Sequence, residues 1–144
     1  MDTKIEEAQK LVEHTYMIEL PVYGAKIEVN ICEPEHFEIY CGCNGFVHHS
    51  YQDEDFYSDK PIARVFVPFN EYDFGIIIHE FTHVKQCLAD YIGTIFDNET
   101  EAYIMGYFAD EITRIFGEHT KRMEAEYDEH KKASKKHDKE IKND

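Results

Sequence analysis

A chain of 144 residues has the length of one globular domain, and its 42% hydrophobic and 14% aromatic residues exclude general disorder. No apolar run approaches the roughly 18 residues that span a bilayer, so we expect no membrane partner. The net charge of −15 belongs to residues 1–116, because residues 117–144 carry eight basic and eight acidic residues. Such an acidic body repels the phosphates of nucleic acids, and we expect no DNA or RNA partner.

The N-terminal residues predict an amphipathic helix from Thr3 to about Ile18. Apolar residues recur there at helical spacing, and Pro21 would close the helix. The segment has no basic start that leads into an apolar stretch, so it does not resemble a secretory signal. We therefore expect the protein to be cytoplasmic.

Strands are predicted in the middle of the chain. Residues 26–31 (KIEVNI) alternate and are rich in β-branched side chains, which favours a strand. Residues 36–49 (HFEIYCGCNGFVHH) are predicted to form two strands around a Cys-Asn-Gly turn, because Asn-Gly supplies the positive φ angles of a tight hairpin. Residues 61–69 are predicted to form a further strand with a proline near each end, and this pattern favours the edge of a sheet.

Cysteine and histidine residues in this region offer a second set of metal ligands. The four cysteines, Cys32, Cys41, Cys43 and Cys87, are expected to be free thiols in a reducing compartment. A metal site formed by the first three with His48 or His49 is the alternative. His48 and His49 follow the predicted hairpin. They could be extra metal ligands, pH-sensitive surface groups or solvated loop residues, and we expect the last of these.

Two helices are predicted after the strands, over residues 70–92 and 97–116, followed by a charged segment at residues 117–144. The expected boundary residues are Asn70 or Asp73 and Gly93 for the first helix, and Asp97 or Asn98 and Gly117 for the second. The charged segment has few apolar residues, which is typical of a solvated helix or a frayed tail.

The first of these helices carries the stretch IIIHEFTHVKQ, with two histidines four residues apart and a glutamate after the first. Residues four apart lie on one face of a helix, so His79 and His83 can direct their imidazoles at a common point. Glu80 lies about 100° further around the helix, beside that point. Two imidazoles suit Zn2+, and Glu80 is placed to take the proton of a water that attacks a carbonyl.

A catalytic zinc needs a third protein ligand, and the next helix carries two candidates. Glu99 shares a face with Ala102, Tyr103 and Gly106, and the small residues on that face favour close packing on the HExxH helix. We therefore expect Glu99 to be the third ligand, with Glu101 as the alternative. Two histidines and one carboxylate also suit ferrous iron, so the identity of the metal stays open.

HEFTH followed by NETEAYIMGYF resembles the small gluzincin metallopeptidases, in which HExxH and a glutamate on the following helix hold zinc. Glu99-x-x-Ala102 is similar to the downstream motif of the ImmA/IrrE-like and membrane-embedded branches, and of small phage-encoded HExxH proteins. The resemblance covers about residues 65–108. It implies His79, His83 and Glu99 as ligands and Glu80 as general base. Tyr103 stands where the family often has Asp or Asn, and we expect it to orient a ligand histidine or to contact the oxyanion.

We therefore expect an α+β fold with a zincin-like domain over residues 1–116 and a charged helix or tail over residues 117–144. The expected order is an N-terminal helix, a small sheet, the HExxH helix and the glutamate-bearing helix. The expected function is zinc-dependent hydrolysis of peptide bonds in a protein or peptide substrate. The alternative is an acidic zinc-binding protein without catalytic activity that inhibits a basic or nucleic-acid-binding protein. The sequence indicates no oligomeric state.

Overall fold

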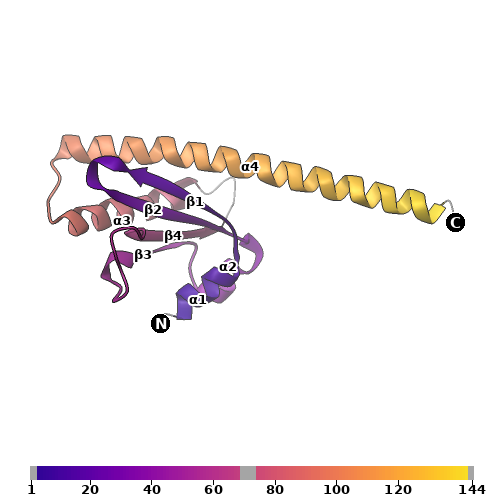
Figure 1. Cartoon of the computed structure of the whole chain (residues 1–144), viewed down its shortest axis with the longest axis horizontal. Helices are drawn as coiled ribbons and strands as arrows, with labels where there is room; N and C mark the ends of the chain where they lie inside the picture. The colour runs from indigo at the N-terminus through magenta and orange to yellow at the C-terminus, as the bar shows by residue number, and fades with distance from the viewer. Residues whose placement is uncertain (1–2, 69–73, 143–144) are drawn as a thin grey trace. The chain divides into compact units, whose positions relative to one another are not determined.

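The computed structural model describes residues 3–68 and 74–142 (Figure 1). Contacts between residues divide the chain into two units, Met1–Ala109 and Asp110–Asp144. The described helices and strands are, in chain order, α1 Thr3–Lys10, β1 Val12–Leu20, η1 Pro21–Tyr23, β2 Ala25–Cys32, α2 Pro34–Cys41, β3 Phe46–His48, η2 Ser50–Gln52, β4 Ala63–Pro68, α3 Phe74–Ile92 and α4 Asn98–Lys142. The predicted domain boundary between residues 116 and 117 is not tested by this division and stays a prediction.

The first unit is built on a sheet with strand order β1-β2-β4-β3. Strand β2 pairs with β1 in antiparallel and with β4 in parallel orientation, and β3 pairs with β4 in antiparallel orientation. The fold is therefore α+β with a small mixed sheet, as the sequence predicts. None of the helices described within residues 3–68 and 74–142 is long and apolar enough to cross a membrane.

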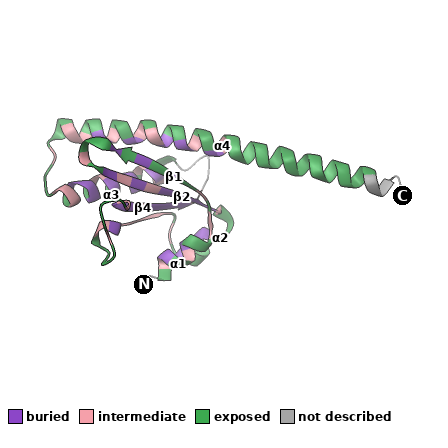
Figure 2. Ribbon diagram, viewed as in Figure 1, coloured by how far each residue is buried: buried purple, intermediate pink, exposed green. Residues whose placement is uncertain are grey.

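Strand β4 is buried on both faces of the sheet (Figure 2). On one face, Phe66 packs in a cluster with residues of α1 and α2, among them Ala8 and Phe37. On the other face, Val65 and Val67 are at most 1% exposed, and Val67 lies near Ile76 of α3. Helix α3 therefore covers the face of the sheet opposite to α1 and α2.

The predicted N-terminal helix is wrong beyond Lys10, where β1 begins after one residue. Buried residues then alternate at Tyr16, Ile18 and Leu20, which is the period of a strand and not of a helix. Pro21 starts a 3-10 turn, and Gly24 follows in a left-handed conformation with φ of 61°. This turn returns the chain along β1 as β2, so the long-range pairing overrides the local helical spacing.

The predicted hairpin at residues 36–49 is also wrong, because its first half is helix α2. Pro34 occupies the first turn, where its missing N–H costs nothing. Gly42 ends the helix with φ of 70° and donates its N–H to the Glu38 carbonyl. The second half supplies the three-residue strand β3, and the predicted strand at residues 26–31 is confirmed as part of β2.

Strand β4 was expected at the edge of the sheet, and this prediction is wrong because it lies between β2 and β3. Its prolines leave the central pairing intact: Pro61 precedes the strand, and Pro68 is its last residue. The run Arg64–Val67 pairs in parallel with β2 and is largely apolar, which is typical of an inner strand. The edge beside β4 is formed by β3.

Helix α3 is confirmed together with its end at Gly93, which has φ of 72°. The expected caps Asn70 and Asp73 lie outside the described residues. The predicted start of α4 is confirmed, because the Asp97 carboxylate accepts a hydrogen bond from the Thr100 N–H at 2.7 Å.

The predicted end of the second helix at Gly117 is wrong, because α4 continues to Lys142. Glycine in a helix costs only about 1 kcal/mol, and the ion pair between Arg114 and Glu118 spans this position at 3.2 Å. Residues 121–139 are exposed and helical, so of the two forms expected for the charged segment the helix is found there.

A candidate metal centre

His79 and His83 lie one turn apart on α3, with both side chains exposed. Their Nε2 atoms are 3.3 Å apart, and the ring planes make an angle of 76°. Zinc–nitrogen bonds of about 2.0 to 2.1 Å and a tetrahedral angle place two nitrogen ligands about 3.3 Å apart. The same distance also permits a hydrogen bond between the rings when one nitrogen carries a proton. The pair thus has the spacing of two ligands on one zinc ion.

Glu80 is buried beside this pair, with 6% of the residue exposed. Burial raises the pKa of its carboxyl group, and the neighbouring histidines act in the opposite direction. A carboxylate in such a place accepts a proton more readily than an exposed one. Glu80 is therefore suited to proton transfer at the opening between α3 and β3.

The histidine pair and Glu80 line a pocket of about 330 Å³ that is shared by α3 and the segment around β3. The other lining residues are Gly45, Phe46, Val47 and His49. A Cβ atom at Gly45 would lie 3.2 Å from Val67 Cγ1 and 3.4 Å from Glu80 Cγ. The missing side chain at this glycine lets the loop before β3 approach Glu80 closely.

Helix α4 contacts a different side of α3. The Phe81 and Phe108 rings are 5.3 Å apart, and Lys85 Nζ lies 3.3 Å from Glu101 Oε1. At about 100° per residue, Phe81 and Lys85 each lie about 200° around α3 from the histidine two residues before. The glutamate-bearing helix therefore packs away from the face that carries His79 and His83.

The predicted inward face of α4 is wrong, because its members Glu99, Ala102, Tyr103 and Gly106 are all exposed. The large apolar residues Ile104 and Phe108 are buried instead. Tyr103, predicted to be catalytic, is 74% exposed and lines a separate groove with residues 20–23. The structure thus does not bring Glu99, Glu101 or Tyr103 to the histidine pair.

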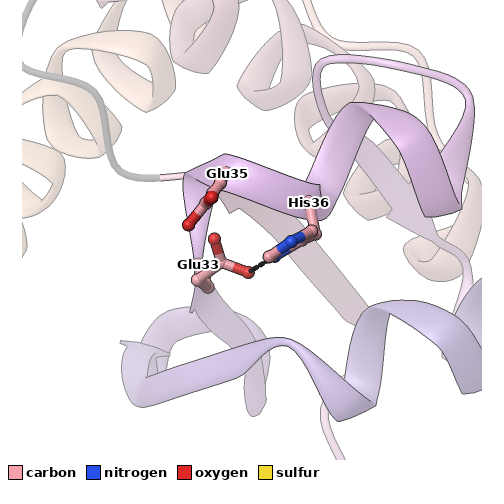
Figure 3. Close-up of side chains that lie close together, drawn as sticks. All are labelled: Glu33, Glu35 and His36. Carbon is pink, nitrogen blue, oxygen red and sulfur yellow. Dashed lines mark hydrogen bonds and ion pairs between the residues drawn. The ribbon is translucent and has the colours of Figure 1, made fainter.

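In the described part of the chain, one group of three potential ligands has all its ligand atoms within 4.8 Å of one another: Glu33, Glu35 and His36 (Figure 3). His36 Nδ1 lies 2.9 Å from Glu33 Oε2. This hydrogen bond lowers the pKa of Glu33 and raises the pKa of His36. The contact is that of an ion pair at the start of α2. The three-residue spacing of Glu33 and His36 could have indicated this pair in the sequence.

The expected alternative site at Cys32, Cys41 and Cys43 is not assembled among the described residues. Cys32 and Cys41 are buried thiols in the α1/α2 cluster. His48 Nε2 is 2.9 Å from Asp53 Oδ2, while His49 lines the pocket of the histidine pair. The two adjacent histidines therefore have different surroundings.

No protein-family model, curated protein or solved structure matches this chain. Interpretation of the site consequently depends on the motif and on the geometry of its own residues.

Proposed function

We propose that this protein is a zinc-dependent metallopeptidase of zincin-like architecture, with His79 and His83 as metal ligands and Glu80 as general base. The observation that carries the proposal is the 3.3 Å distance between the two Nε2 atoms, with a buried glutamate beside them. Burial of a carboxyl group is costly, and a cation bound by the two histidines would offset that cost for Glu80.

A bound zinc ion supplies a Lewis acid that polarises a carbonyl and makes a water more acidic. The chain itself supplies proton transfer. Glu80 takes a proton from the water whose oxygen forms the new bond to the carbonyl carbon. It then delivers a proton to the amide nitrogen as the carbon–nitrogen bond breaks. Two peptide fragments leave, one with a carboxylate and one with an amine.

An extended peptide is the substrate form that fits the place of the pocket. Strand β3 borders the pocket, and within the described residues it pairs only with β4. Main-chain hydrogen bonds to a free strand edge hold peptides in extended form. Strand β4, which the sequence placed at the edge of the sheet, is internal and has no such edge to offer.

The test compares the wild type with Glu80→Gln and His79→Ala. We expect about one equivalent of zinc in the wild type and in Glu80→Gln, and a large loss of zinc in His79→Ala. His36→Ala is the matched control, since it removes a histidine from the other group of potential ligands. Loss of metal in His36→Ala but not in His79→Ala would place the ion at Glu33 and reject the proposed site. Metal analysis also decides between zinc and iron.

Cleavage is then tested by exposing a bacterial lysate to the wild type and to Glu80→Gln and sequencing new peptide termini. We expect new termini with the wild type only, because Glu80→Gln retains the ligands but cannot accept the proton. Identical termini with both proteins would reject hydrolysis. Retained zinc with that result would favour the acidic binding protein.

A further inference from the structure

We propose that His49 is the third protein ligand of the metal ion that His79 and His83 bind. This inference depends on the proposed metal site and adds to it a residue outside the HExxH motif. A catalytic zinc commonly has three protein ligands and one open position. Since α4 packs on the opposite side of α3, the third ligand, among the residues that the structure describes, is expected from the other wall of the pocket.

His49 belongs to that wall, directly after β3. Side chains alternate along a strand, and Val47 is paired with Val65 on the face that α3 covers. His48 is paired with Arg64 on the other face and contacts Asp53. The next residue in this alternation returns to the side of α3, which agrees with the place of His49 in the pocket.

The backbone at His49 and just after it is held by hydrogen bonds. Its carbonyl accepts the Gln52 N–H at 3.1 Å, and the Tyr51 N–H is donated to the Ile62 carbonyl at 3.1 Å. The His49 residue itself is partly exposed. The His49 ring lies 6.3 Å from the Tyr51 ring, centroid to centroid, so the fixed backbone holds the imidazole at the wall of the pocket.

His49 does not form a group with His79 and His83 in which all ligand atoms lie within 4.8 Å. Binding therefore requires its ring to turn inward about its side-chain bonds, with the histidine pair already at chelating distance. Three neutral imidazoles form a donor set that suits zinc and leaves Glu80 uncoordinated. That division keeps the carboxylate available for proton transfer.

The experiment measures affinity for Zn2+ by competition with a chromophoric chelator, and the absorption spectrum of the Co2+ form, in the full chain. His49→Ala and His49→Gln are compared with His48→Ala, the adjacent histidine on the other face, and with Glu99→Gln. We expect both His49 variants to lose at least about 100-fold in Zn2+ affinity and to change the Co2+ spectrum. We expect less than about threefold loss for His48→Ala and Glu99→Gln. Circular dichroism of each variant without metal controls for folding.

His79→Ala separates the failure of this inference from the failure of the site. If His79→Ala loses the metal while both His49 variants match His48→Ala, the site stands and His49 is not a ligand. A selective loss in Glu99→Gln would assign the third position to Glu99 and also overturn the inference. If His79→Ala retains the metal, the proposed site itself is wrong.

Discussion

At the scale of single residues, the candidate site depends on how closely the loop before β3 approaches Glu80. Gly45 has φ of 157°, a conformation that L residues rarely adopt, and its missing Cβ would meet Val67 and Glu80. An added Cβ would be tightest against Val67 Cγ1, at 3.2 Å, and would lie 3.4 Å from Glu80 Cγ. Gly45 therefore lies close both to a sheet residue, Val67, and to the proposed general base, Glu80.

We expect Gly45→Ala to lower the free energy of unfolding by about 1 to 3 kcal/mol, through backbone strain and the close contacts of the new methyl group. Urea unfolding measures the effect. Gly106→Ala is the control, because this helical glycine has nothing within 4 Å of an added Cβ, and it should gain about 0.5 to 1 kcal/mol. Equal stability of Gly45→Ala and the wild type would mean that the approach of the loop to Glu80 is not tight.

Two buried thiols give the protein a pH dependence of its own. Burial raises the pKa of Cys32 and of Cys87 to about 12, from an ordinary value of 9.0. A folded state that holds its protons more tightly is favoured below the unfolded pKa and loses this advantage as the pH rises towards the folded one. We therefore expect the free energy of unfolding to fall between about pH 9 and 12.

Urea unfolding at pH 7.5, 9 and 10 in a reducing buffer measures this fall. Lysine and tyrosine also titrate in that range, so Cys87→Ala is compared with the wild type by slope and not by absolute stability. The variant should show the shallower dependence on pH. An unchanged slope would mean that the Cys87 thiol ionises as easily in the folded protein as in the unfolded chain.

At the scale of helices and strands, local signals predicted α3, most of β2 and the start of α4. Apolar spacing, β-branched alternation and the Asp97 cap each act within a few residues. The strand β1 and the inner place of β4 were missed because each depends on a distant partner. Helix α2 was missed although Pro34 and Gly42 are local signals for it, because the Asn-Gly pair favoured a hairpin. Ile18, for example, fits a helical spacing in the sequence but is buried by pairing with β2.

The candidate site divides in the same way. His79, Glu80 and His83 follow from the spacing of one helix and could be found in the sequence. The place of Glu99 depends on which face of α4 packs inward, and the small residues Ala102 and Gly106 indicated the wrong face. His49 could not be placed from the sequence. Only its neighbour His48 marked it, and the strand before it has three residues, too few to show which face of the sheet each side chain takes.

The packing of α4 on α3 gives a prediction that separates stability from metal binding. Phe108 is fully buried against Phe81, so Phe108→Ala should cost about 3 to 5 kcal/mol in unfolding free energy. Zinc affinity of the folded variant should stay within about threefold of the wild type, because the histidines lie on another face of α3. Tyr103→Ala is the exposed control and should change neither quantity. A loss of zinc affinity beyond tenfold in folded Phe108→Ala would show that α4 contributes to the site.

At the scale of the whole molecule, charge should decide which peptides reach the pocket. The sequence carries 15 basic and 30 acidic residues, and its net charge of −15 belongs to residues 1–116, which include α3 and the whole sheet. A field of one sign raises the local concentration of oppositely charged ligands, and salt weakens it over a Debye length of about 10 Å at 0.1 M.

On the proposed function, we expect kcat/KM for a lysine-flanked peptide to exceed that for a serine-flanked peptide of equal length by about tenfold at low salt, with the ratio falling towards one at 1 M. Faster cleavage of an aspartate-flanked peptide, or a ratio independent of salt, would show that contacts inside the pocket, and not the field of the molecule, select the substrate.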